Sequence, residues 1–176
     1  MKQVSSLAKP ILVFSGGEPL LRDDIYELAE YAYAAGLKPA LATNATLVSR
    51  EVAEKLKISG IRLVSISIYG ASSDTHDGFC AKEGAFEKTM KGVENLKNAG
   101  IDIQINTTIT KKNLSEMKAI GDFAVAQGAV AYHAFFLVPT GRGKYIEGDE
   151  MSGAEYEKAF NRLSDFQQGF PIRFKA

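Results

Sequence analysis

The sequence repeats one short unit, in which a helical stretch ends at a glycine and an apolar run follows. Each of these glycines stands where a helix commonly ends in a left-handed residue, and the stretch after it has strand character. The glycines are Gly36, Gly60, Gly100 and Gly128. Strands that alternate with helices in this way predict right-handed βαβ units and a parallel sheet. We therefore expect an α/β fold with about five parallel strands, near residues 11–14, 39–43, 62–68, 102–110 and 130–138.

Two of the expected strands alternate aliphatic and polar residues, although a parallel sheet covered on both faces normally has unbroken aliphatic runs. In 62–68 and in 102–110 the aliphatic side chains would share one face and the polar ones the other. The polar positions are Ser65, Ser67, Tyr69, Gln104, Asn106 and Thr108. A polar inner face suits a partial barrel that holds a polar ligand, because an unpaired buried amide costs about 1 to 3 kcal/mol. The alternative is that these groups bond to one another or to water.

The turn at residues 15–18, Ser-Gly-Gly-Glu, follows the first expected strand and precedes Pro19. Ligands of βα folds bind at the carboxyl ends of the strands, and this turn lies at such an end. Two glycines allow a ligand to approach backbone N–H and C=O groups closely, and the carboxylate of Glu18 could bind an ammonium group. The spacing matches neither a phosphate-binding P-loop nor a dinucleotide fingerprint. A tight turn that starts a helix with an ordinary glutamate is the alternative.

The charge and cysteine content excludes several partners and sites. The 21 basic and 21 acidic residues give a formal net charge of +0, so no nucleic-acid or anionic-membrane partner is expected. No apolar run approaches the roughly 18 residues of a membrane span, and residues 1–10 lack the apolar core of a secretory signal. The single cysteine, Cys80, cannot form an intrachain disulfide or a cysteine cluster. These features predict a cytoplasmic protein.

Five motifs follow one another in a fixed order along nearly the whole chain. They are SGGEPLL at 15–21, ATNATL at 42–47, SISIYGASSDTHD at 65–77, INTTIT at 105–110 and FFLVPTGRG at 135–143. In this order they resemble the radical S-adenosylmethionine (SAM) superfamily, whose members use a partial (β/α)6 barrel. The VPTGRG stretch is similar to that of members that modify tetrapyrroles in alternative haem and haem d1 biosynthesis.

The resemblance implies an enzyme that needs more than this chain contains. Radical SAM enzymes hold a 4Fe-4S cluster on the cysteines of a Cys-x3-Cys-x2-Cys loop, and the cluster delivers the electron that cleaves SAM. Because Cys80 is the single cysteine, we expect the cluster ligands outside this chain. We interpret residues 1–176 as one partial-barrel domain. We expect it to lack two parts: the first βα unit with its cluster loop, and a C-terminal extension that bears cysteines. The fragment alone would then be inactive, whereas the intact parent would be an enzyme.

The resemblance also implies positions that contact SAM. They are Ser15, Gly16, Gly17, Glu18, Asn44, Ser67, Asn106, Leu137, Val138 and Pro139. The turn at 15–18 matches the motif that holds the SAM amino group, and Asn44 matches the polar end of the next strand. Ser67 and Asn106 match contacts to the ribose or the methionine carboxylate, and 137–139 matches the segment that packs against adenine. The resemblance assigns no catalytic residue and no metal ligand within the chain.

The sequence departs from the pattern of these enzymes in the segment after the third expected strand. Tyr69 stands where they often have aspartate, and Cys80 and Ala81 stand where they often have arginine and glycine. A ribose contact at position 69 and a carboxylate clamp at 80 and 81 are therefore not expected. Two other classes of function are kept open. One is a SAM- or nucleotide-binding module that discarded the cluster, and the other is a barrel enzyme with a phosphate-bearing substrate.

The expected partners follow from the same resemblance. They are a small-molecule or tetrapyrrole substrate and an electron donor for the intact parent. A peptide-modifying radical SAM maturase shares most of these motifs, so a peptide substrate is the alternative. The strand at 11–14 would be an exposed sheet edge if the first βα unit is missing, and a homodimer could form through it.

A few other side chains could carry chemistry. We interpret His76 as a surface residue near a helix start, and His133 as a strand residue with satisfied hydrogen bonds rather than a ligand. Cys80 lacks neighbours that would activate its thiol beyond Lys82, which predicts an unreactive residue. Arg142 lies between two glycines and suits anion recognition and solvent equally well.

Overall fold

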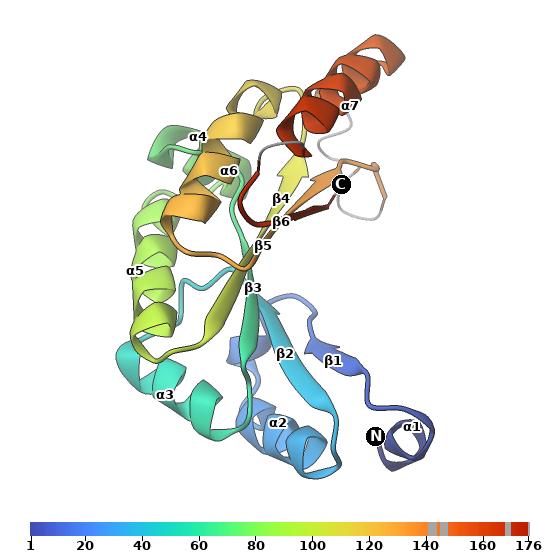
Figure 1. The fold of residues 1–176 in the computed structure, drawn as a ribbon. Coiled ribbons are helices and arrows are strands. Elements are labelled where there is room, and N and C mark those ends of the chain that lie inside the picture. The colour runs from blue at the N-terminus through green and yellow to red at the C-terminus, as the bar shows by residue number, and fades with distance from the viewer. Residues whose placement is uncertain (141–143, 145–147, 168–169, 176) are drawn as a thin grey trace. The chain divides into compact units, whose positions relative to one another are not determined.

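The computed structural model describes residues 1–140, 144, 148–167 and 170–175, whose strands form a six-stranded sheet. The strands are β1 (Ile11–Phe14), β2 (Lys38–Thr43), β3 (Leu63–Ser67), β4 (Asp102–Ile109), β5 (Ala131–Phe136) and β6 (Arg173–Lys175). Their order in the sheet is their order in the sequence, and the pairs β1/β2, β2/β3 and β5/β6 are parallel (Figure 1). The predicted α/β fold with a parallel sheet is confirmed.

The sheet contains one strand more than the sequence predicts. β6 consists of Arg-Phe-Lys, with one apolar side chain between two charged ones. So short a segment has no hydrophobic periodicity, and its pairing with β5 defines it as a strand. The other strands begin and end within two residues of the expected ranges.

Helices alternate with the strands. The α-helices are α1 (Lys2–Leu7), α2 (Ile25–Ala34), α3 (Arg50–Ile58), α4 (Ser73–Cys80), α5 (Ala85–Asn98), α6 (Met117–Ala126) and α7 (Gly153–Gln167), and the short 3-10 helices are η1 (Pro19–Leu21) and η2 (Leu114–Glu116). The glycines of the repeat have positive φ, as the predicted helix caps require. At Gly60, with φ of 93°, an added Cβ would lie 2.6 Å from Cγ of Tyr33. Within the described residues, no helix has the length and apolar character needed to cross a membrane.

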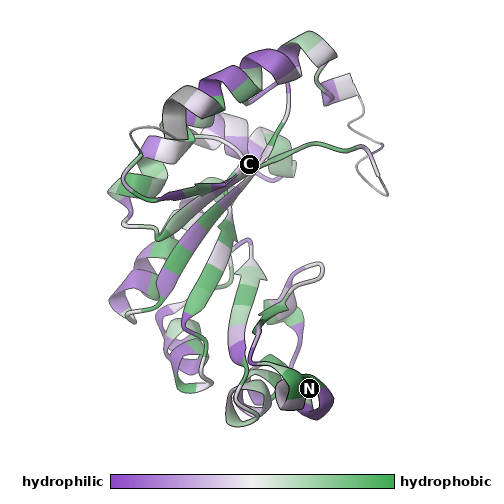
Figure 2. Cartoon of the chain, turned by 45° about the vertical axis from the view of Figure 1, so that its right-hand side comes forward, coloured by the Kyte–Doolittle hydropathy of each residue, from purple (hydrophilic) through white to green (hydrophobic). Residues whose placement is uncertain are grey.

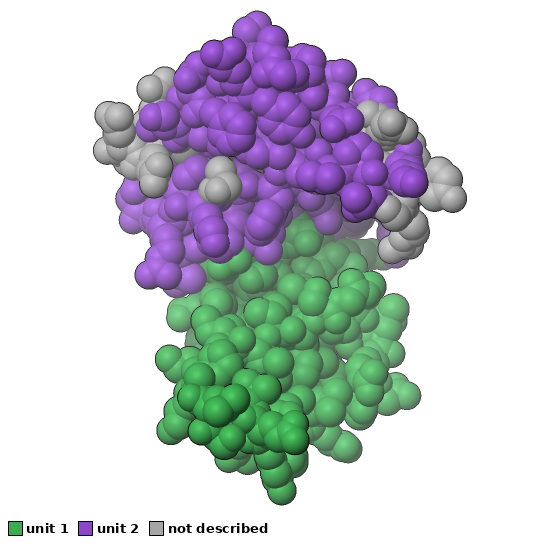
Figure 3. Space-filling model, turned by 90° about the vertical axis from the view of Figure 1, so that its right-hand side faces the viewer, with its two compact units in different colours: residues 1–67, 87–104 green, residues 68–86, 105–176 purple. Residues whose placement is uncertain are grey.

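The chain divides into two compact units (Figure 3). Unit 1 comprises Met1–Ser67 and Glu87–Gln104, and unit 2 comprises Ile68–Phe86 and Ile105–Ala176. Each unit has its own apolar core. Side chains with no more than 1% of their surface exposed include Leu41, Leu56, Val64, Ile66 and Leu96 in unit 1, and Ile68, Ile105, Ile109, Ile120 and Tyr132 in unit 2. Burial of each large apolar side chain contributes roughly 1.5 to 3 kcal/mol to the free energy of folding. These cores hold in place the strands whose ends carry the predicted site residues.

β3 and β4 show the alternation that the sequence predicts, and Figure 2 shows hydrophobic and hydrophilic residues interleaved along the strands. The aliphatic residues of both strands are mostly buried, whereas the intervening polar residues are half-buried. The half-buried polar residues are Ser65, Ser67, Gln104, Asn106 and Thr108. One face of each strand therefore belongs to a core, and the other presents polar side chains.

Candidate functional site

The turn after β1 presents open backbone. Ser15, Gly16 and Gly17 are all exposed. Gly16 has φ of 151°, a conformation that residues with a Cβ rarely adopt, so glycine is required there for backbone reasons. A Cβ added to Gly17 would meet nothing within 4 Å. Because packing within the chain does not require a glycine at 17, the space beside it is available to a ligand.

Glu18 connects this turn to the end of β2. Its Oε1 accepts hydrogen bonds from the Leu20 amide at 3.1 Å and from the Thr43 hydroxyl at 2.7 Å, and its Oε2 accepts one from the Asn44 amide at 2.9 Å. The hydrogen bond from the Leu20 amide caps the start of η1. This contact is the one expected if Glu18 were only an ordinary glutamate at a helix start. The other two cross to the neighbouring strand. A carboxylate accepts about four hydrogen bonds, so Oε2 retains capacity for a cationic N–H donor.

Thr43 is a site residue that the sequence analysis did not assign. Only 3% of its surface is exposed, and its hydroxyl both donates to Glu18 and accepts from the Ala45 amide at 3.0 Å. Ala45 is fully buried with φ of 60°, and a Cβ on Gly92 of α5 would lie 2.2 Å from its carbonyl oxygen. The end of β2 is thus tightly constrained. Its place at the last position of a strand, directly before Asn44, is the sequence feature that could have identified Thr43 as a site residue.

Asn44 is exposed at this edge and shapes the chain around it. Its Oδ1 accepts hydrogen bonds from the Thr46 amide at 2.9 Å and the Thr46 hydroxyl at 2.7 Å, and its backbone oxygen accepts one from Thr89 at 2.9 Å. Among the described residues its Nδ2 amide has no partner. The side chain of Asn44 is therefore held by Thr46 and its backbone amide by the Glu18 carboxylate, so the structure brings the predicted Ser15–Glu18 turn and Asn44 together.

The remaining predicted SAM contacts lie elsewhere in the two units. Ser67 ends β3 in unit 1, whereas Asn106 and residues 137–139 belong to unit 2. The Leu137 amide donates to the Ile109 carbonyl at 3.0 Å, and its carbonyl accepts from the Tyr156 hydroxyl at 3.1 Å. Leu137 is buried, but Val138 is 67% exposed. That these residues join the turn at 15–18 in one site stays a prediction.

In unit 2, the segment after β3 is held by a buried hydrogen-bond network. The Nδ2 of Asn113 donates to the carbonyls of Tyr69 at 2.8 Å and Thr108 at 2.9 Å, and its Oδ1 accepts from the Thr110 amide at 2.8 Å. The Glu116 carboxylate accepts from the Ala71 amide at 2.7 Å and from the Thr75 hydroxyl. These hydrogen bonds therefore hold the segment after β3 in one conformation within unit 2.

The prediction that His76 lies on the surface is wrong. Ser72 caps α4 instead, and the helix turns His76 inward, where 2% of its surface is exposed. Its Nδ1 accepts a hydrogen bond from the Tyr69 amide at 3.2 Å, which makes it part of the same network. Burial lowers the pKa of His76, so its neutral form is favoured. The ring of Tyr69 stacks on Phe79 with centroids 4.1 Å apart.

The other sequence predictions have simpler outcomes. Burial, and secondarily the Asp77 carboxylate, raises the pKa of the Cys80 thiol, which agrees with an unreactive cysteine. Arg142 lies outside the described residues. Within the described part of the chain, no group of three His, Cys, Asp or Glu side chains is placed to hold a metal ion.

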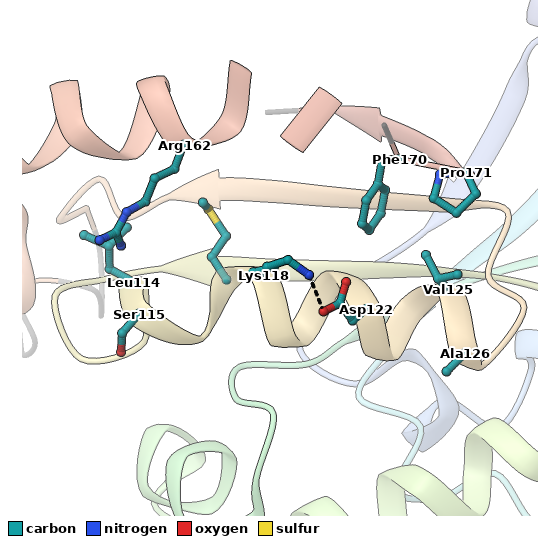
Figure 4. Close-up of a pocket in the computed structure, with 10 residues that line it drawn as sticks. Leu114, Ser115, Lys118, Asp122, Val125, Ala126, Arg162, Phe170 and Pro171 are labelled. Atoms are coloured by element: carbon teal, nitrogen blue, oxygen red, sulfur yellow. Dashed lines mark hydrogen bonds and ion pairs between the residues drawn. The ribbon is translucent and has the colours of Figure 1, made fainter. Parts of the chain in front are cut away.

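A cavity of about 860 Å³ lies in unit 2 beside α6, bordered by α7 and the segment before β6 (Figure 4). Apolar side chains such as Met117, Val125 and Phe170 line much of it. Its floor carries the ion pair of Lys118 with Asp122, at 2.7 Å from Nζ to Oδ2. None of the predicted SAM contacts lines this cavity, so it is separate from the strand-end site.

Comparisons with known proteins show the family of the chain. Residues 1–124 match the family model described as the Radical SAM superfamily. An AdoMet-dependent heme synthase of Methanosarcina barkeri (strain Fusaro / DSM 804) is 49% identical over 174 residues, which cover 99% of this chain and 49% of that protein. An Fe-coproporphyrin III synthase of the same organism is 34% identical over 173 residues, or 96% of this chain and 43% of that protein.

A solved structure described as native anSMEcpe with bound AdoMet and Cp18Cys peptide has the same fold. It superposes with a TM-score of 0.76 at 21% identity, covering 98% of this chain and 53% of that one. The expected partial-barrel fold is thereby confirmed. The chain spans about half the length of the curated relatives that it matches.

Proposed function

The chain belongs to the radical SAM superfamily, and we propose that it is the SAM-binding core of an enzyme that modifies a tetrapyrrole side chain in haem or haem d1 biosynthesis. In this family a 4Fe-4S cluster supplies the electron that cleaves SAM. A chain with the single cysteine Cys80 cannot supply three thiolates, so the cluster ligands and the electron donor would come from outside these 176 residues.

The observation that carries the proposal is the arrangement around Glu18. SAM has a cationic amino group and an anionic carboxylate on the same carbon. The Oε2 of Glu18 can accept from the ammonium, because one of its acceptor positions has no partner among the described residues. The side-chain Nδ2 of Asn44, at the end of the neighbouring strand, has no partner among the described residues, and the open backbone at Gly16 and Gly17 allows close approach. The residues present therefore suit the methionine end of SAM.

The tetrapyrrole substrate is supported by similarity to the named relatives rather than by this site. The heme synthase relative aligns with 99% of the chain, so the alignment includes the predicted SAM contacts of both units. A second candidate is a SAM- or nucleotide-binding module without turnover, which the single cysteine favours. The two candidates share the Glu18 site and differ in whether SAM is cleaved by the intact parent.

The proposal extends to assembly and location. β1 forms one end of the sheet, and Ile11 and Val13 are 58% and 51% exposed. We infer that another chain covers this edge, as a homodimer would. The low cysteine content supports a cytoplasmic location.

Calorimetric titration of the 176-residue chain with SAM tests the binding step. We expect the unsubstituted 176-residue chain to bind SAM. The substitution Glu18→Gln should weaken binding by about 10- to 100-fold, because a charge-assisted hydrogen bond contributes about 1.5 to 3 kcal/mol. Glu54→Gln, an exposed glutamate on α3 of the same unit, is the matched control and should leave binding unchanged. Equal affinities for parent and Glu18→Gln would refute the proposed site.

A further inference from the structure

The strands β5 and β6 lie side by side in unit 2 (Figure 1), and one face of the pair carries a cationic and aromatic group of residues. The parallel register places Ala131 beside Arg173 and His133 beside Lys175. Paired residues of neighbouring strands lie on the same face, and Phe135, two residues after His133, shares it. We call His133, Phe135, Arg173 and Lys175 the β5/β6 cationic face.

The opposite face of the same strands belongs to the core. Tyr132 is fully buried, and its ring lies 5.5 Å from that of Phe174, its partner in the register. Burial raises the pKa of Tyr132 to about 12, against an opposing effect of the Thr107 hydroxyl on β4. Thr107 is fully buried as well, so it lies on the same side of the sheet as Tyr132. The β5/β6 cationic face lies on the other side, which is also the side of the half-buried Asn106.

The charges of this face are not neutralised within the described chain. Arg173 and Lys175 are exposed, and neither has an ion-pair partner among the described residues. Besides burial, both cations lower the pKa of His133, which places them in its electrostatic surroundings. Phe135 is 52% exposed although its side chain is large and apolar. The face thus offers positive charge next to an open aromatic ring.

We propose that the β5/β6 cationic face binds a carboxylate side chain of the substrate, with Arg173 and Lys175 contacting the anion and Phe135 contacting an adjoining flat ring. The inference rests on the proposed function and assigns the carboxylate arms of its macrocyclic substrate to a site in unit 2. Guanidinium and ammonium groups form strong charge-assisted hydrogen bonds to carboxylates. An aromatic ring gains several tenths to about 1.5 kcal/mol from stacking, beyond area burial.

Fluorescence titration with coproporphyrin III, a tetrapyrrole whose charged groups are propionates, tests the inference on the 176-residue chain. We expect Arg173→Gln and Lys175→Gln each to weaken binding about tenfold, and Lys175→Arg to retain it because the charge is kept. Lys88→Gln, an exposed lysine on α5, is the matched control and should bind as the parent does. The inference would be overturned if the unsubstituted 176-residue chain did not bind coproporphyrin III, or if both Gln variants bound it as tightly as the unsubstituted chain.

Two further measurements separate this inference from its rivals. Phe135→Ala should weaken porphyrin binding about fivefold if a ring contacts it, whereas strong competition by inorganic phosphate with no effect of Phe135→Ala would indicate a phosphate site and contradict the inference. SAM titrated into Arg173→Gln and Lys175→Gln should bind as in the parent. If the unsubstituted 176-residue chain did not bind SAM, the proposed function would be refuted. The porphyrin titration reports on the β5/β6 cationic face alone.

Discussion

Replacement of Thr43 by valine tests whether the link between the turn and β2 stabilises unit 1. The side chains have nearly the same shape, so the substitution leaves no large cavity. It removes the donor to the Glu18 Oε1 and the acceptor for the Ala45 amide, a contact that is buried. The lost charge-assisted bond is worth about 1.5 to 3 kcal/mol, and an unsatisfied buried N–H costs about 1 to 3 kcal/mol.

These losses share one hydroxyl and are not additive, so we expect destabilisation by about 3 kcal/mol. Urea unfolding of the 176-residue chain measures it as a shift of the midpoint by about 1 to 3 M, since the slope for small proteins is about 1 to 3 kcal/mol/M. Thr140→Val, an exposed threonine in unit 2, is the control and should change stability by no more than about 0.5 kcal/mol. An unchanged midpoint for Thr43→Val would show that the Glu18 contacts do not stabilise the end of β2.

Three other predictions concern the surrounding fold. Asn113→Ala should destabilise the chain by about 2 to 4 kcal/mol in the same urea assay, because Asn113 is fully buried and makes hydrogen bonds to three backbone groups; a loss below about 0.5 kcal/mol would contradict the role given to the network. The lowered pKa of His76 means that the folded chain binds a proton less readily than the unfolded one, so its contribution is full above pH of about 6.5 and declines as pH falls toward the folded pKa. His76→Gln should reduce this slope in unfolding measured from pH 7.5 to pH 5, without abolishing it because the pKa of His133 is also lowered; an unchanged slope would refute the assignment. Gly60→Ala should cost more than Gly128→Ala by thermal unfolding, since both have positive φ but only at Gly60 does a Cβ meet a ring, and equal losses would show that Tyr33 moves aside easily.

Much of the fold could be predicted because periodic patterns report which side chains are buried. The glycines at 36, 60, 100 and 128 stop their helices with positive φ, as their spacing indicated. The alternation in β3 and β4 matched their burial. β6 could not be predicted from its own residues, since three positions carry no period and its place comes from pairing with β5.

The candidate site was predictable where a backbone constraint shows in the sequence, and not where it depends on tertiary contacts. The paired glycines and Glu18 identified the turn, yet two of the three partners of Glu18 lie 25 and 26 residues away along the chain. Thr43 stands beside Asn44 at a strand end in the sequence, but nothing in the sequence indicates its contact with Glu18. His76 sits near a helix start, where exposure is usual, and only the packing of Tyr69 and Phe86 around it reveals burial.

The central claim is that Glu18 receives the amino group of SAM. Calorimetry would measure the affinities of the unsubstituted 176-residue chain and of Glu18→Gln for two ligands: SAM, and the analogue in which hydrogen replaces the α-amino group. The four affinities give the coupling free energy between the amino group and Glu18. We predict that the parent prefers SAM by about tenfold or more and that Glu18→Gln binds the two ligands with nearly equal affinity. The same preference for SAM in both proteins would contradict the account, because the amino group would then be recognised elsewhere.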